Sequence, residues 1–445
     1  MRRLLAVTLA ALVFPAAASA HATLTKTQPQ YGTGVEQSPK VVRLEFDQTV
    51  DALPNAIRVY SADGRLLSGA THTTTGSRVM VAPVSRLVRG GYTVRWSAVS
   101  ADGHVVSGVF TFGVRQRAPS ASDAFGAGGP TTEEHLVRWL YFVALALLAG
   151  GLGFRLLVVR RPFAPAAQRR FYQLVGVGVV GALEVGILAF LLRAEDALQL
   201  PFVDFFYGDL SPLAKTRFGT AFVAMTLGYA LVAALVFLAW LTEREKLLWP
   251  AFLLALGFAS GLSLSGHSAA DTGSSWLSQL ADWLHLAAAS LWVGGLVQLA
   301  FVVWPLEPEL RRRAFLRFSK LATALIVVLL AAGTYLSILR LPHLSDLWTQ
   351  GYGHVLLVKL GLVSLALMWG AAHHFLVRPR LERGAPPFAG LPRSLAGESA
   401  VGVAILLAAA VLVDSKPPPQ PVQKQLGTSG GAVPGRLSTV SSSAP

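Results

Sequence analysis

The sequence has 445 residues, of which 53% are hydrophobic and only 14% are charged. Soluble domains carry about 25% charged residues, so this composition excludes an ordinary soluble protein and indicates long apolar runs that lie in a membrane. The net charge of +14 does not indicate a nucleic-acid partner, because most Lys and Arg residues stand at the ends of apolar runs, as the positive-inside rule predicts.

Residues 1–20 have the pattern of a secretory signal peptide. Two arginines are followed by a short apolar run and by the small-residue sequence Ala-Ser-Ala at 18–20. Cleavage after residue 20 would make His21 the new N-terminus. An N-terminal histidine offers its α-amine and its ring Nδ1 to one metal ion, and these two nitrogens close a chelate ring that an internal histidine cannot form.

Residues 21–114 are predicted to form a soluble all-β sandwich. Val42, Leu44 and Phe46 alternate with polar or charged neighbours, which is the period of a half-buried strand. The same alternation recurs over 92–96 and 110–114, and Gly-containing turns separate the runs. Several short strands in one domain of this size favour a sandwich.

Asp102 and His104 are candidate metal ligands in the segment between two predicted strands. Residues two apart in an extended chain point the same way, so both side chains can face one ion. Cysteine is absent and the four methionines are not clustered, so the ligands available are nitrogen and oxygen. Two imidazoles, an amine and a carboxylate suit Cu(II), and binding should weaken at acid pH. Taken alone, Asp102-Gly103 would be an ordinary turn, and it is the pairing with His21 that favours a copper site.

Residues 115–134 are rich in Pro, Gly, Ser and Ala and are predicted to be a linker, and residues 414–445 are predicted to be a disordered tail. Between them, residues 135–413 contain eight apolar runs, each near the length of about 20 residues that crosses a bilayer. The predicted all-α bundle has transmembrane helices near 136–159, 171–193, 218–241, 247–266, 277–304, 320–340, 354–377 and 394–413.

The distribution of charge predicts the topology. If the β domain is exported, the loops that then face the cytoplasm hold far more Lys and Arg than the loops that face outward. We therefore expect a multi-pass protein of the cytoplasmic (inner) membrane whose N-terminal domain lies on the periplasmic or extracellular side.

Polar side chains inside spanning helices are costly and point to function. Asp282 and His285 are three residues apart and share a helix face. We expect a membrane copper path on the outer side, formed by His135, His267, Asp282, His285, His354 and Lys359. Two other interpretations remain open, namely that His135 and His354 only sit among lipid headgroups, and that Asp282 only neutralises Lys359.

Residues 21–114 resemble the CopC family of periplasmic copper-binding proteins. The matching features are His21, PQYGTG at 29–34, LEFDQTV at 44–50 and WSAVSADGHVVSGVFTFGV at 96–114. The resemblance implies a cupredoxin- or immunoglobulin-like sandwich that binds Cu(II) through His21, Asp102 and His104. Some members have an acidic residue near the copper where Gln48 falls, with Asp47 beside it, so a contribution from either residue is left open.

Residues 135–413 resemble the CopD family of copper-resistance membrane proteins. The matching features are Ser-Gly-His at 265–267, DWLHLAAASLWVGGL at 282–296 and YGHVLLVKLGLVSLAL at 352–367. The whole chain thus resembles a CopC–CopD fusion, which implies a role in copper homeostasis or resistance, with copper import proposed for the membrane part.

The leading hypothesis is a non-enzymatic protein that binds Cu(II) outside the membrane and passes it to the bundle for uptake. Its expected partners are the copper ion, the lipid bilayer and other periplasmic copper carriers. The sequence contains no Gly-x-x-x-x-Gly-Lys-[Ser/Thr] loop, so no nucleotide is expected. The alternatives are a copper-dependent oxidase and a copper-binding scaffold or sensor without transport.

Overall fold

A computed structural model describes residues 22, 24–73, 77–100, 105–119, 132–198, 217–265, 276–341 and 343–415. Four of the predicted site residues, His21, Asp102, His104 and His267, lie outside these described residues. The predicted signal peptide, most of the predicted linker and almost all of the predicted tail lie outside them as well.

The N-terminal part forms two four-stranded sheets. One sheet has the strand order β1-β3-β6-β5 and the other has the order β2-β8-β7-β4. The pairing is antiparallel except between β2 and β8. The strands are β1 (Leu24–Gln28), β2 (Gly34–Val35), β3 (Val41–Phe46), β4 (Val50–Ser61), β5 (His72–Thr73), β6 (Val79–Pro83), β7 (Gly90–Ser100) and β8 (Val105–Val114).

The predicted alternation along the strands is confirmed, since Val42, Leu44 and Phe46 of β3 are all buried. They meet residues of the other sheet in one core, where the rings of Phe46 and Trp96 lie edge to face with centroids 5.4 Å apart. Burial of each large apolar side chain contributes roughly 1.5–3 kcal/mol, so this shared core holds the two sheets together as a sandwich.

The C-terminal part is helical, and its described residues include four π-helical segments, η2, η3, η6 and η7. The segments are α2 (Thr132–Leu145), η2 (Ala146–Gly150), α3 (Gly151–Gly153), η3 (Phe154–Val159), α4 (Pro165–Leu198), α6 (Arg217–Thr242), η5 (Glu245–Leu247), α7 (Leu248–Ser265), α9 (Trp276–Gln298), η6 (Leu299–Val303), α10 (Trp304–Leu306), α11 (Arg311–Arg340), α12 (Asp346–Thr349), α13 (Gly351–Ala372), η7 (His373–Val377), α14 (Arg378–Glu382) and α15 (Leu391–Asp414).

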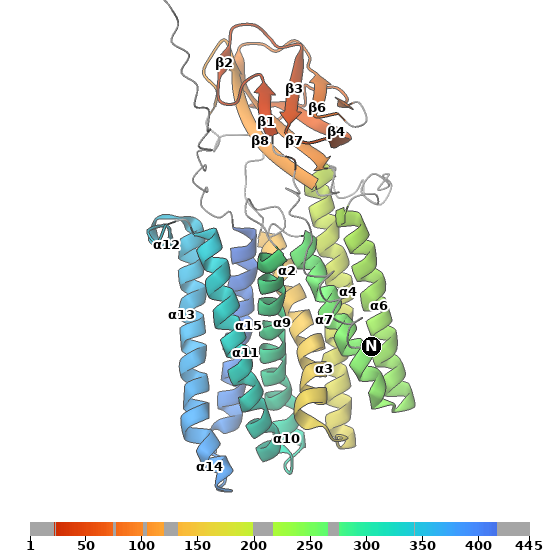
Figure 1. The fold of residues 1–445 in the computed structure, drawn as a ribbon, viewed down its shortest axis with the longest axis vertical. Helices are drawn as coiled ribbons and strands as arrows, with labels where there is room; N and C mark the ends of the chain where they lie inside the picture. The colour runs from red at the N-terminus through yellow and green to blue at the C-terminus, as the bar shows by residue number, and fades with distance from the viewer. Residues whose placement is uncertain are drawn as a thin grey trace, which may run out of the picture.

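These segments make eight long helices, as predicted. Within the described residues, seven are long and apolar enough to cross a membrane, and the remaining long helix is the 18-residue α7. The helices run side by side, and the sandwich lies at one end of the bundle, where β4 contacts α4 (Figure 1). The loops with α10 and α14 lie at the opposite end, which is the end that carries the predicted cytoplasmic arginines.

The helix containing α2 and the helix containing α9 form the centre of the bundle. Buried residues make up 78% of the apolar window in the first and 72% in the second, against 17% in α11 and 11% in the α13 helix. The two central helices cross at glycine, since a Cβ added to Gly294 would lie less than 2.5 Å from the Ala146 carbonyl oxygen. Small residues allow such a close backbone approach between membrane helices.

Candidate functional site

The structure describes the residues next to the predicted copper ligands of the sandwich. These neighbouring residues all lie at one end of the domain. Val99 of β7 pairs with Val105 of β8, so the described ends of these two strands lie side by side. Asp102 and His104 belong to the segment between these ends in the sequence. In the same sheet, Val50 at the start of β4 pairs with Ser100 at the end of β7. Ser100, the last described residue before Asp102, therefore lies beside the start of β4.

The beginning of the described chain belongs to this same end of the sandwich. Leu24 at the start of β1 pairs with Phe46 at the end of β3, and Ala22 is buried in the shared core. Only residues 47–49 separate the end of β3 from the start of β4. Strand pairing thus brings the positions next to His21 and the positions next to Asp102 and His104 to one edge of the domain.

Asp47 and Gln48 lie in the connection between β3 and β4, at the edge just described. Asp47 is exposed and Gln48 is half-buried, and both make polar contacts. His72, at the start of β5, is exposed and belongs to the other sheet. His72 is therefore a surface histidine.

In the bundle, Asp282 and His285 lie on α9 and are both half-buried. The His285 Nδ1 atom is buried and has no hydrogen-bond partner among the described residues. The ring packs against α11 at Gly333, where an added Cβ would lie 3.0 Å from Cε1 and 3.4 Å from Nδ1. Gly333 therefore leaves the space that the imidazole occupies.

Lys359 lies on α13 and is half-buried. It interacts electrostatically with Asp282 and His285 of α9, and Arg340 at the end of α11 adds another positive charge to the group. No ion pair within 4 Å joins Asp282 to Lys359 among the described side chains, so the two are neighbours without direct neutralisation.

His135 and His354 lie at the starts of α2 and α13, at the end of the bundle nearest the sandwich. His135 is half-buried, whereas His354 is exposed and donates from Nε2 to the Trp348 carbonyl oxygen at 2.9 Å. Among the described residues, no three His, Asp or Glu side chains lie close enough together to hold one metal ion.

One pair of buried ionisable residues was not predicted from the sequence. His373 Nδ1 lies 2.8 Å from Glu398 Oε2, between η7 and α15, and both side chains are at least 90% buried. The His373 Nε2 atom hydrogen-bonds with Ser394 Oγ at 2.8 Å, and Ser394 Oγ also accepts from Trp369 Nε1 at 2.8 Å. The adjacent histidines at 373 and 374 are visible in the sequence, but only the fold brings α15 beside them.

Gln298 is a second buried polar residue that the sequence did not single out. It is 0% exposed at the end of α9, and neither of its amide atoms has a hydrogen-bond partner among the described residues. It lies against Gly151, where an added Cβ would be 2.9 Å from Nε2. Its polar group therefore faces the centre of the bundle where α3 and η6 begin.

Three family models match separate parts of the chain. The CopC domain matches residues 24–115, the copper resistance protein D-like N-terminal domain matches residues 134–277, and copper resistance protein D matches residues 312–412.

The chain is similar to copper transport protein CutJ of Bacillus subtilis, with 29% identity over 437 residues that cover 92% of this chain and 77% of that protein. It is also similar to copper resistance protein D of Pseudomonas syringae, with 30% identity over 45% of this chain and 66% of that protein. The crystal structure of CopC from Methylosinus trichosporium OB3b is 29% identical, with a TM-score of 0.20, over 21% of this chain and 93% of that chain.

Proposed function

We propose a copper-uptake function for this chain, which joins a CopC domain to a copper resistance protein D region and so belongs to the copper resistance and transport proteins. In this proposal the sandwich captures Cu(II) on the periplasmic or extracellular side. The ion then passes to the histidine and carboxylate side chains of the bundle. The observation that carries the proposal is the presence of both copper domains in one chain, with the sandwich at the end of the bundle where α2 and α13 begin.

The capture step uses nitrogen and oxygen ligands. His21 would supply its amine and imidazole, and Asp102 and His104 would complete the set, which suits Cu(II). The strand register supports this arrangement, because Leu24 and Ser100 lie next to Phe46 and Val50, on either side of the short connection between β3 and β4. In this proposal the folded sandwich preorganises the ligands before copper arrives.

The acceptor in the bundle would be the group around His285. Its free Nδ1 atom faces the interface between α9 and α11, and Asp282 is one turn away on the same helix. The carboxylate would offset the charge of the arriving cation, whereas Lys359 and Arg340 oppose it and would limit how tightly the ion is held. A site that only relays an ion needs moderate affinity, so this mixture of charges suits passage better than storage.

The test measures copper in cells that produce equal amounts of the full chain. His285→Ala should lower cellular copper to the level of cells without the protein, because the imidazole acceptor is lost. His343→Ala is the matched control, since His343 is an exposed histidine in the loop after α11. Wild-type copper accumulation in the His285→Ala cells would overturn the transport proposal.

The capture step is tested separately by Cu(II) titration of the purified full chain. His104→Ala should weaken binding by roughly 100-fold or more, because a direct ligand contributes at least as much as its supporting groups do. His72→Ala should leave the affinity unchanged, since this exposed histidine belongs to the other sheet. Equal affinities of the two variants would remove His104 from the ligand set.

A further inference from the structure

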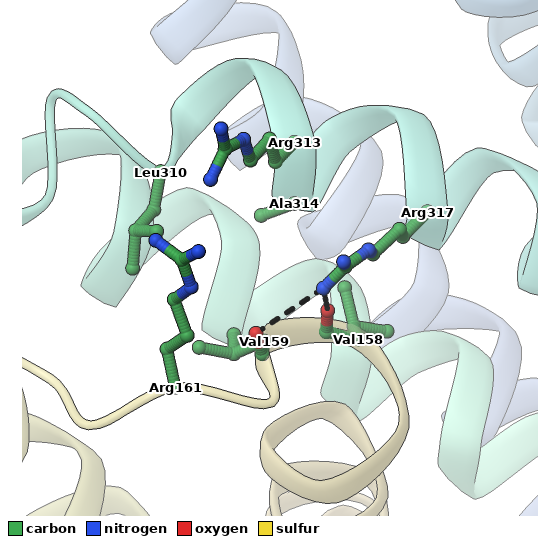
Figure 2. A pocket seen from close by; sticks show the side chains of 7 residues that line it. All are labelled: Val158, Val159, Arg161, Leu310, Arg313, Ala314 and Arg317. Atoms are coloured by element: carbon green, nitrogen blue, oxygen red, sulfur yellow. Dashed lines mark hydrogen bonds between the residues drawn. The ribbon is translucent and has the colours of Figure 1, made fainter.

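A surface pocket at the end of the bundle away from the sandwich is lined by three arginines. Its lining residues are Val158, Val159, Arg161, Leu310, Arg313, Ala314 and Arg317. The guanidinium groups come from two segments, the turn after η3 and the first turns of α11, and Figure 2 shows them around a floor of apolar side chains. The pocket is therefore cationic at its rim and apolar at its base.

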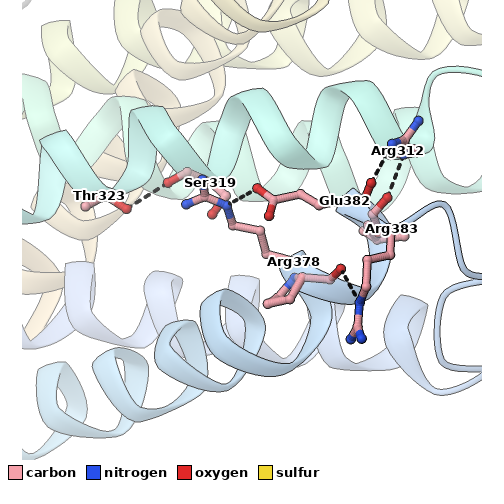
Figure 3. Close-up of polar contacts among 8 residues, drawn as sticks. Arg312, Ser319, Thr323, Arg378, Glu382 and Arg383 are labelled. Atoms are coloured by element: carbon pink, nitrogen blue, oxygen red, sulfur yellow. Dashed lines mark hydrogen bonds and ion pairs between the residues drawn. The ribbon is translucent and has the colours of Figure 1, made fainter.

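Most of the neighbouring arginines at this end already have partners. Arg312 donates to the backbone carbonyl oxygens of Leu381 and Glu382 at 2.6 and 2.9 Å, and Arg378 pairs with the Glu382 carboxylate at 2.8 Å (Figure 3). Arg155 forms an ion pair with Glu245. Arg312 and Arg155 join separate segments, whereas Arg378 pairs within α14, and all three side chains already have partners in the fold.

Arg161 and Arg313 differ from these neighbours. Both are exposed, and neither makes a hydrogen bond or an ion pair with any described residue. Like charges that converge on one pocket repel each other, at a cost that an anion bound between them would offset. The two side chains therefore carry positive charge at the pocket that no described residue neutralises.

The backbone around the pocket is held in place by other contacts. Arg317 donates from Nη1 to the carbonyl oxygens of Val158 and Val159 at 3.0 and 3.3 Å, which caps the end of η3 (Figure 2). The Ala164 amide donates to Glu307 Oε1 at 2.6 Å, which joins the segment that carries Arg161 to the loop before α11. The Glu307 carboxylate is used in this contact and does not line the pocket.

We propose that Arg161 and Arg313, with Arg317 beside them, bind the phosphate group of an anionic glycerophospholipid. Guanidinium groups match phosphate oxygens in geometry, and basic pockets at the cytoplasmic ends of membrane helices suit lipid headgroups. A lipid is favoured over free phosphate because the pocket lies on a bundle of apolar helices, and because Leu310 offers a partly exposed apolar side chain next to the charges. The site is independent of copper and goes beyond the proposed uptake function.

The test measures binding of short-chain phosphatidylglycerol to the purified full chain in a nonionic detergent, with phosphatidylcholine and inorganic phosphate as comparison ligands. Wild type should bind phosphatidylglycerol well above the other two. R161Q/R313Q should lose roughly 20-fold or more in affinity, since each basic side chain near an anionic lipid contributes about 1 kcal/mol. The charge-matched control is R169Q/R170Q, which removes two exposed arginines from the start of α4 that do not line the pocket.

The variant R161K/R313K controls for misfolding, because it keeps the net charge of this face and loses only the forked geometry of the two guanidinium groups. It should bind phosphatidylglycerol several-fold more weakly than wild type. Equal losses in R161Q/R313Q and R169Q/R170Q would overturn the proposal, since the lipid would then respond to the charge of the whole face. Inorganic phosphate that binds as tightly as phosphatidylglycerol would overturn the lipid assignment.

Discussion

At the scale of single residues, the proposed copper site depends most on the free amine of His21. Ala22 is buried in the sandwich core, so only one peptide bond separates position 21 from a fixed point of the fold. In the proposed site, this short link to Ala22 would hold the amine close to the edge where β3 ends and β4 begins.

One added residue before His21 should weaken Cu(II) binding by orders of magnitude. The extension turns the amine into an amide and destroys the chelate ring, while the imidazole remains. Cu(II) titration of the mature protein with and without an added alanine measures the effect, and mass spectrometry verifies each N-terminus. Full affinity in the extended protein would show that the amine is not a ligand.

The same titration repeated across pH gives a check on the ligand types. Amine and imidazole nitrogens bind copper only when deprotonated, so affinity should fall as the solution becomes more acidic.

The buried pair of His373 and Glu398 leads to a second prediction at the scale of single residues. His373→Phe leaves the buried Glu398 carboxylate without its partner, and the loss of one partner of a buried pair costs about 3 kcal/mol or more. The double variant His373→Phe with Glu398→Leu should recover most of that stability, because neither polar group remains. Unfolding in detergent measures both variants.

His374→Phe is the control for this pair, since the adjacent histidine is half-buried and forms no ion pair among the described residues. It should change stability by less than about 1 kcal/mol. A His373→Phe protein as stable as wild type would show that the pair contributes nothing to the fold.

These two sites differ in how far the sequence could predict them. His21, Asp102 and His104 stand in a recognisable pattern, and strand register alone brings their neighbours together. Glu398 stands alone in the sequence near the start of the last apolar run. Its role depends on which face of α15 meets η7, and this is set by packing across the bundle, which no local pattern records.

At the scale of secondary-structure elements, the crossing of α2 and α9 depends on glycine. Gly150 and Gly294 face each other there, and an added Cβ on Gly294 would overlap the backbone of η2. The sequence Trp-Val-Gly-Gly at 292–295 therefore allows the two helices to pack closely.

Gly294→Ala should destabilise the bundle by roughly 1–3 kcal/mol or more, because backbone atoms rather than flexible side chains would have to move. Gly361→Ala on α13 is the control, since an added Cβ there meets nothing within 4 Å. The control should be neutral or slightly stabilising, because alanine favours helix more than glycine does. Thermal unfolding in detergent compares the two variants, and equal midpoint temperatures would contradict the close crossing of the two helices.

The apolar runs predicted the helices well but not their full lengths. The sixth run was predicted from residue 320, whereas α11 begins at Arg311. Hydropathy marks only the part that lies in lipid, and the basic first turns continue the helix into the headgroup region. The arginines of these turns contact η3 and α14, so tertiary contacts fix the start of α11.

At the scale of the whole molecule, the two copper domains are joined in one chain. Tethering raises the effective concentration of the donor at the acceptor, to the millimolar range for short flexible linkers. The benefit should be largest when copper is scarce, because a free carrier then rarely meets the membrane protein.

Cutting the chain between residues 120 and 131 should therefore lower copper uptake about 10-fold or more at limiting copper and much less at high copper. A protease site inserted there allows the comparison, and the same insertion without cleavage is the control. Uptake that is unaffected by the cut at every copper concentration would show that tethering has no part in the transfer.

The order of the two domains and their fold classes followed from composition and periodicity. The position of the sandwich beside the starts of α2 and α13 could not be predicted in this way, because the sequence between the domains carries no periodic pattern. The prediction of an eight-helix bundle succeeded because each helix must satisfy its own backbone in lipid, and this requirement leaves a long apolar run in the sequence.

The backbone contact between Gly294 and η2 has a consequence for motion. Two helices that touch through main-chain atoms have little room to move against each other, so we expect the helix containing η2 and the helix containing α9 to move together. In the proposed copper transport, an opening past His285 would then come from displacement of the less buried α11 and α13. The stationary part of such a transporter would be its glycine-lined centre, and the gate would lie at its periphery.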